Sequence, residues 1–117
     1  MRYAFISDIH ANLEALEAAL DDIRSRSIDE VYCLGDIVNY GASPNECLTR
    51  VRESTREIIQ GNHEAALVSD EVANSFNPFA KSAIYWTREH LNAADRRALS
   101  QLPFLFERNN WVMVHGT

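Results

Sequence analysis

Residues 3–10 read Tyr-Ala-Phe-Ile-Ser-Asp-Ile-His, and the change from apolar to polar within this segment predicts much of the fold. Its first half is typical of a short buried strand, and leucines at helical spacing begin at Leu13. Asp8 and His10 therefore lie at the carboxyl end of a strand, where open α/β sheets bind ligands. A carboxylate and an imidazole this close in sequence favour one corner of a metal site, although a single Asp at a strand end is also a common helix cap.

Two further strands follow the same plan. An amphipathic helix is predicted at 12–26, and apolar strands are predicted at 30–34 and 56–60. The first of these strands ends in Gly35-Asp36 and the second in Gly61-Asn62-His63-Glu64. Strands connected through helices in this order form right-handed βαβ units with parallel strands. The sequence therefore predicts an α/β or α+β fold.

Several helices have recognisable starts. Ser43 is expected to cap a helix, with Pro44 in its first turn and Glu46 completing a capping box. Another helix is predicted to start at Pro78, and Asn92 is expected to cap a third that stops before Pro103. The residues expected to share one face of the helix from Pro78 are Phe79, Ala83, Trp86, His90 and Leu91.

A hairpin is predicted near the end of the chain, with strands at 104–107 and 111–115 around a turn at 108–110. If all strands shared one sheet, the polar clusters at their ends would converge on one rim. The candidate metal ligands are Asp8, His10, Asp36, Asn62 and His115, and His63 remains as a candidate acid. Each cluster alone has a simpler explanation as a turn, a helix cap or a buried histidine. Their recurrence at four strand ends favours a metal site.

Composition limits the function further. The chain has 117 residues, enough for one domain over 1–117, and 46% of them are hydrophobic, which favours a packed core over disorder. A net charge of −6 argues against a bare nucleic-acid-binding surface. No apolar stretch approaches the roughly 20 residues of a membrane helix, and no signal peptide is recognisable. The two cysteines, Cys33 and Cys47, are expected to be reduced, so we expect a cytoplasmic protein.

The ordered series of these motifs resembles the calcineurin-like metallophosphoesterases over nearly the whole chain. The series is Asp8-x-His10, Gly35-Asp36, Gly61-Asn62-His63-Glu64 and His115-Gly116. The opening at residues 7–16 and the segment from Gly35 to Gly41 are most similar to the small prokaryotic branch, which includes the YfcE-like phosphodiesterases. The resemblance implies a sandwich of two sheets flanked by helices.

The resemblance also implies an activity and roles for the site residues. Asp36 would bridge two divalent ions, with Asp8 and His10 on the first and Asn62 and His115 on the second. A bridging hydroxide would attack phosphorus, and His63 would act near the leaving group. The oxygen and imidazole ligands suit Mn, Fe or Zn, with Mn or Fe favoured. The expected activity is that of a phosphodiesterase on a small phosphate ester or nucleotide.

Two departures from the family pattern qualify these expectations. The pattern continues with Gly-His-x-His, which these residues lack, so we expect an N-terminal portion of such a domain, with an exposed sheet edge that invites self-association. Asn39-Tyr40 stands where the protein Ser/Thr phosphatases carry Asp-Arg, which disfavours that activity. The alternative is a non-catalytic binding or regulatory module. A nucleotide-binding domain without hydrolysis is disfavoured because no glycine-rich phosphate loop is present.

Overall fold

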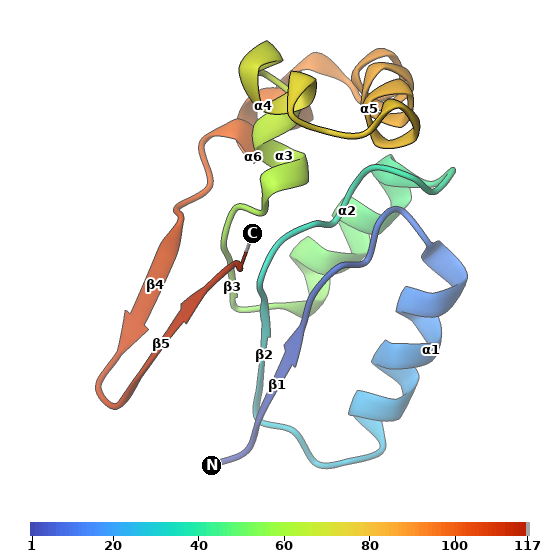
Figure 1. Cartoon of the computed structure of the whole chain (residues 1–117). Coiled ribbons are helices and arrows are strands. Elements are labelled where there is room, and N and C mark those ends of the chain that lie inside the picture. Colours follow the sequence, from blue (N-terminus) through green and yellow to red (C-terminus); the bar gives the residue numbers. More distant parts are fainter. Residues whose placement is uncertain (117) are drawn as a thin grey trace.

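A three-stranded parallel sheet forms the centre of the fold in the computed structural model, which describes residues 1–116 (Figure 1). Its strands are β1 (Tyr3–Ile6), β2 (Glu30–Cys33) and β3 (Glu57–Ile58), in the order β1-β2-β3. Helix α1 (Leu13–Arg24) connects β1 to β2, and helix α2 (Pro44–Ser54) connects β2 to β3. The predicted βαβ units are therefore confirmed.

The two helices cover one face of this sheet because side chains alternate along β2. Cys33 points to the helices and is buried among Leu16, Leu20 and Val51. Tyr32, its neighbour in the strand, is buried in a second apolar cluster on the opposite face. Both faces of the sheet thus contribute to a core.

The hairpin packs on the second face as a separate sheet, in agreement with the two-sheet arrangement that the family resemblance implies, so the condition that all strands share one sheet is not met. Among the described residues, strands β4 (Leu105–Arg108) and β5 (Trp111–Val114) pair only with each other, in antiparallel register. Met113 is buried against Tyr32 and Ile59, and partly buried aromatic side chains surround these three. A tight turn pairs the two strands locally, and their apolar side chains then find the free face of the parallel sheet. The predicted α/β fold class, with two sheets and flanking helices, is confirmed.

Four helices lie above the carboxyl ends of the parallel strands in Figure 1. They are α3 (Asn62–Ala66), α4 (Asp70–Asn74), α5 (Pro78–His90) and α6 (Ala93–Ser100). The predicted start of α5 at Pro78 and the Asn92 cap of α6 are both confirmed, since Asn92 Oδ1 accepts a hydrogen bond from Asp95 N at 2.8 Å. No helix among the described residues is long and apolar enough to cross a membrane.

The face of α5 that carries Phe79 and Trp86 is not the buried face of the helix. The helix buries Ala80, Ile84 and Thr87, whereas the side chains of Phe79 and Trp86 are 85% and 40% exposed. Small side chains on the buried face let the helix approach α2 and α4 closely, which two large aromatic rings would prevent. A hydrophobic pattern read along a single helix does not show which of two faces meets its neighbours.

The predicted capping box of α2 is also absent. Ser43 precedes the helix, but its side chain makes no capping hydrogen bond. Its backbone amide instead donates to Ala11 O at 3.1 Å. Strand β3 is shorter than predicted because Gln60 N donates to Pro103 O at 2.7 Å and so leaves the ladder. Both of these backbone hydrogen bonds join loops near the strand ends.

The two cysteines are free and fully buried, as expected. Burial raises the pKa of the Cys33 thiol to about 12 and that of Cys47 to about 11. Since the thiolate is the reactive form, neither should react with a charged disulfide reagent at neutral pH while the protein is folded. Thiol titration should detect both groups after addition of guanidinium chloride. Rapid modification of either one in the native protein would contradict this packing.

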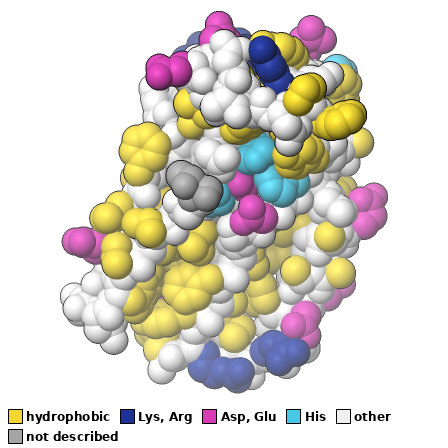
Figure 2. Space-filling view, in the orientation of Figure 1, with side chains coloured by type: hydrophobic (Ala, Val, Ile, Leu, Met, Phe, Trp, Pro, Cys, Tyr) yellow, Lys and Arg dark blue, Asp and Glu magenta, His cyan; other side chains and the backbone are white. Residues whose placement is uncertain are grey.

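Exposed apolar side chains gather on the lower half of the molecule, around β1, β4 and β5 (Figure 2). Phe5 is 49% exposed, and Val112 and Val114 are each 53% exposed. Within the described part of the chain, β1 has a strand partner on one side only. Such a surface favours pairing between chains.

We therefore expect two copies of this chain to associate through that surface. Sedimentation velocity should show a mass that rises with concentration, and Val112→Lys should weaken the association because it places a charge in the contact. Thr49→Lys, on the exposed side of α2, is the matched control. A monomer at all concentrations would be the opposite result.

Candidate metal centre

The loops after β1 and β2 have a tightly bent backbone. Asp8, His10 and Asp36 have φ values of 55°, 50° and 55°, in the left-handed region that non-glycine residues seldom adopt. Each such residue costs on the order of 1–3 kcal/mol and persists only where the surroundings enforce it. Here the two loops are joined by backbone hydrogen bonds, among them Asp8 N to Gly35 O at 3.1 Å and His10 N to Asp36 O at 2.9 Å.

The carboxylate of Glu64 binds the backbone of the loop after β2. Its Oε1 accepts hydrogen bonds from Asp36 N at 2.7 Å and Gly61 N at 2.9 Å. Its Oε2 accepts from Ile37 N at 2.9 Å and Val38 N at 3.4 Å. Burial raises the pKa of Glu64, and the backbone amides oppose that rise. A fully buried side chain thus fixes the backbone of Asp36.

Glycine at position 61 is required by the close approach of Asp36. A Cβ added at Gly61 would overlap both the backbone amide and the carboxylate of Asp36. The loop after β3 can therefore lie directly against the loop after β2. The His63 amide then donates to Asp36 Oδ1 at 3.0 Å, which leaves Oδ2 free for other partners.

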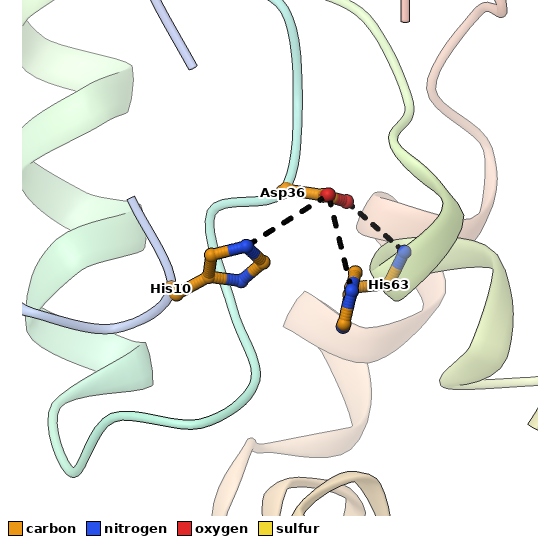
Figure 3. A group of neighbouring side chains, drawn as sticks. All are labelled: His10, Asp36 and His63. Carbon is orange, nitrogen blue, oxygen red and sulfur yellow. Dashed lines mark hydrogen bonds and ion pairs between the residues drawn. The ribbon is translucent and has the colours of Figure 1, made fainter. Parts of the chain in front are cut away.

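Three imidazoles surround that second oxygen. His115 Nε2 lies 3.0 Å from Asp36 Oδ2, His10 Nε2 lies 3.9 Å away and His63 Nε2 lies 4.0 Å away. Figure 3 shows the side chains of His10, from the loop after β1, and His63, from helix α3, converging on Asp36. Asp36 is 2% exposed. This oxygen is the centre of the candidate site.

Two overlapping groups of metal-binding side chains share Asp36. One is His10, Asp36 and His63, and the other is Asp8, Asp36 and His115, with the ligand atoms of each group within 4.8 Å of one another. Asp8 Oδ1 also lies 3.5 Å from His10 Nε2. The structure therefore brings together Asp8, His10, Asp36, His63 and His115. His115 follows β5 of the second sheet and still reaches the Asp36 carboxylate, although the strands do not all share one sheet.

Asn62 and Asp8 occupy the margins of the site. Asn62 is the first residue of α3 and lines a cavity of about 370 Å³ together with His115. Asp8 is exposed and lines a second cavity of about 500 Å³ with His10 and Tyr40. A hydrogen bond from Ser7 Oγ to Asp8 Oδ2 at 2.5 Å lowers the pKa of Asp8, partly opposed by burial. Asp8 is thus held as a carboxylate facing an open cavity.

In His10 and His115, the nitrogen that points away from Asp36 is Nδ1, and its hydrogen bond fixes the tautomer of the ring. His115 Nδ1 lies 2.6 Å from Leu34 O, and His10 Nδ1 lies 3.2 Å from Val38 O. A carbonyl oxygen only accepts, so Nδ1 carries the proton in both rings. When such a ring is uncharged, its Nε2 directs a lone pair toward the carboxylates. The 3.0 Å contact between His115 Nε2 and Asp36 Oδ2 is favourable with a proton on Nε2 or with a cation beside both atoms.

This donor set fits divalent metal ions. Among the described residues, the only ion pairs of Asp36 are with histidines, and no Lys or Arg compensates its buried charge. A metal-binding His typically donates its other ring N–H to a carbonyl, as His10 and His115 do here. Oxygen and imidazole donors of this kind suit several divalent ions and select none of them.

His63 differs from the other two histidines. It is 7% exposed, and burial lowers its pKa while the charge of Asp36 opposes that shift. Its ring lies between the rings of Phe76 at 4.7 Å and Tyr40 at 5.2 Å. Its Nδ1 lies 2.9 Å from Asn39 Nδ2 rather than from a carbonyl.

Sequence reasoning missed three residues of this site. Glu64 belongs to the recognised Gly-Asn-His-Glu motif, but nothing in the pattern indicated that it holds four backbone amides. Asn39 and Tyr40 were noted only as departures from the phosphatase pattern. Both have positive φ, 79° and 74°, which brings the Tyr40 ring over His10 at 5.0 Å. Their roles depend on contacts across loops that a sequence does not show.

Comparison with known proteins agrees with this geometry. The sequence model of the calcineurin-like phosphoesterases matches residues 1–117. The chain belongs to this family. It is 43% identical over 106 residues to the uncharacterized protein MJ0912 of Methanocaldococcus jannaschii, covering 91% of this chain and 44% of that protein.

Solved structures with the same fold agree with this match. A metallophosphoesterase from Sphaerobacter thermophilus is 41% identical with a TM-score of 0.81, and the match covers 100% of this chain and 47% of that one. Protein PH1004 from Pyrococcus horikoshii is 24% identical with a TM-score of 0.77, covering 89% of this chain and 48% of that one. The chain spans about half the length of the relatives it matches.

Proposed function

We propose that this chain forms a dinuclear metal centre that hydrolyses phosphodiesters. The observation that carries the proposal is the buried Asp36 carboxylate, whose free oxygen faces three imidazole nitrogens at 3.0–4.0 Å and has no Lys or Arg partner among the described residues. An oxygen shared in this way suits a ligand that bridges two ions. Family membership supports phosphoester hydrolysis, and the finer assignments below are ours.

Asp36 would be the shared ligand of the two ions. Asp8 and His10 would hold the first ion, and Asn62 and His115 the second. The two groups in the structure instead associate Asp8 with His115 and His10 with His63. Because all four side chains border Asp36, small rotations on metal binding can reconcile the two arrangements. Bound divalent ions would supply a nucleophilic water at neutral pH and neutralise charge on the phosphate.

The protein's own groups would orient the substrate and stabilise its leaving oxygen. His63 Nε2 faces the centre of the site, where it can donate a hydrogen bond to the leaving oxygen as the P–O bond breaks. Asn62 offers an oxygen without a negative charge, so it does not repel an anionic substrate. The cavity of about 500 Å³ beside Asp8 and His10 has room for a small phosphate ester or nucleotide.

A diester is favoured over a monoester by charge. A monoester dianion benefits more from a nearby cation than a diester monoanion does. Tyr40 occupies the position where the Ser/Thr phosphatase pattern carries Arg, and no described Lys or Arg contacts the site. Mn or Fe is our favoured metal, and the two reduced, buried thiols fit a cytoplasmic location.

Metal-dependent hydrolysis by the wild-type chain and a His63→Ala variant tests the proposal. We expect turnover of an aryl phosphodiester to rise with added Mn²⁺ and to exceed turnover of the matching aryl monoester. His63→Ala should lower kcat by about 10²–10³-fold, the usual cost of removing one hydrogen-bond donor to a developing negative charge.

His90→Ala is the matched control, because His90 is exposed on α5 and stacks on Trp86, away from the site. It should leave kcat unchanged. Equal activity of the wild type with and without Mn²⁺, or no hydrolysis at any metal concentration, would favour the non-catalytic module instead.

A further inference from the structure

Asn39 is the only described residue that hydrogen-bonds the outer nitrogen of His63. It is fully buried, and its amide nitrogen Nδ2 lies 2.9 Å from His63 Nδ1 and 3.2 Å from Ala80 O. The positive φ of Asn39 turns its side chain inward, between the loop after β2 and helix α5. The amide therefore connects a site histidine to a rigid helix.

The Ala80 carbonyl determines which way the amide faces. A carbonyl oxygen only accepts hydrogen bonds, so the Asn39 NH₂ group, and not Oδ1, must face it. The second N–H of the same group then points to His63 Nδ1, which has to accept it. In the reversed orientation, Oδ1 would lie against Ala80 O, and two acceptors would face each other in a buried position.

The consequence is that neutral His63 carries its proton on Nε2. That nitrogen lies 4.0 Å from Asp36 Oδ2 and faces the centre of the site. His10 and His115 have the opposite arrangement. In each, Nδ1–H donates a hydrogen bond to a carbonyl oxygen, so Nε2 of the uncharged ring presents its lone pair to the site. Three imidazole rings thus meet at the Asp36 carboxylate, of which two present a lone pair and one presents an N–H.

We propose that Asn39 is a positioning residue that makes His63 a hydrogen-bond donor at the site, in contrast to His10 and His115, which present lone pairs for metal ions. The catalytic meaning of this arrangement rests on the proposed function, whereas the hydrogen bond itself does not. An uncharged His63 already presents an N–H to a leaving oxygen. His63 is correspondingly unsuited to bind a metal through Nε2.

The orphaned oxygen of Asn39 supports a role beyond packing. Asn39 Oδ1 is buried and has no hydrogen-bond partner among the described residues, which is unfavourable for stability. An apolar side chain of similar size, such as Leu, would avoid this cost. The rings of Phe76 and Tyr40 flank His63 and limit its rotation, so the amide sets the tautomer of a ring whose plane is already fixed.

Nitrogen-15 NMR of the metal-free wild-type chain tests the hydrogen bond directly. At about pH 8, where an ordinary imidazole is neutral, we expect a protonated-type shift for His63 Nε2 and an unprotonated-type shift for Nδ1. A nitrogen–nitrogen coupling through the hydrogen bond should link Asn39 Nδ2 to His63 Nδ1. A protonated Nδ1, or the absence of this coupling, would overturn the proposal without any variant having to fold.

Two variants test the consequence for His63. In Asn39→Asp, a carboxylate replaces the donor, so Nδ1 of His63 should become protonated. In Asn39→Leu the coupling partner is gone, and kcat should fall while KM changes little, because substrate contacts remain. If folded Asn39→Asp kept an unprotonated Nδ1, the positioning role would be wrong.

Asn45→Leu is the matched control. Asn45 also has a buried, unpartnered Oδ1 and donates Nδ2 to a carbonyl, that of His90 at 2.9 Å, but it contacts no imidazole. It should leave the His63 shifts and kcat unchanged. If the coupling is present but Asn39→Leu retains full kcat, the hydrogen bond stands and the catalytic role of His63 fails. If the coupling is absent in an active enzyme, the proposed function stands and the positioning role fails.

Discussion

Replacing Asp36 by Asn is expected to abolish tight metal binding and, with it, hydrolysis. One oxygen of Asp36 faces all three imidazoles, and the other accepts the His63 amide, so both candidate ion positions depend on this carboxylate. The substitution removes a buried negative charge while it keeps the shape of the side chain. Activity should fall by more than the roughly 10–100-fold that loss of an outer partner of a metal ligand costs.

Calorimetric titration with Mn²⁺ measures the first part of this prediction, and diester hydrolysis measures the second. Asp21→Asn is the matched control, because Asp21 is an exposed carboxylate on α1 that pairs only with Arg24. That variant should bind Mn²⁺ as the wild type does. Unchanged Mn²⁺ affinity in folded Asp36→Asn would remove Asp36 from the centre of the site.

Replacing Glu64 by Ala is expected to destabilise the protein strongly. The side chain is fully buried and accepts four backbone hydrogen bonds, at 2.7–3.4 Å, from the loop that carries Asp36 and from Gly61 before helix α3. Each buried donor left without a partner costs about 1–3 kcal/mol, so the free energy of unfolding should fall by at least about 3 kcal/mol. The loops that these bonds join should also lose their alignment.

Urea unfolding of three variants separates this effect from a general loss of charge. Glu64→Gln keeps one acceptor oxygen and should lie between the wild type and Glu64→Ala. Glu89→Ala, on the exposed side of α5, should change stability by less than about 0.5 kcal/mol. If Glu64→Ala were as stable as Glu89→Ala, the loops would be held by something other than this carboxylate.

The positions of the candidate ligands could be predicted from sequence because strand ends are easy to recognise. Asp8, Asp36 and His63 each follow a short apolar strand, and parallel strands place such ends on one edge. His115 was predicted for a partly wrong reason, since its strand belongs to the hairpin on the other face of the sheet. Because β5 packs across the parallel sheet, His115 still reaches the edge at which the parallel strands end.

The contacts that organise the site could not be predicted in the same way. Apart from the bond between Glu64 and Gly61, Glu64 and Asn39 act through hydrogen bonds to residues between 24 and 41 positions away in sequence, and such pairings have no local pattern. The exposed face of α5 shows the same limitation. Phe79 and Trp86 suggested a buried stripe, but small residues such as Ala80 met the neighbouring helices instead. Local patterns identify elements, and packing decides their orientation.

The most direct measurement of the central claim is anomalous diffraction from crystals of this chain soaked in MnCl₂. We predict two manganese peaks on either side of the Asp36 carboxylate, one near His10 and the other near His115. His63 Nε2 should lie near the peaks without contacting either ion. Manganese bound only at exposed acidic side chains, with no peak beside Asp36, would contradict the account.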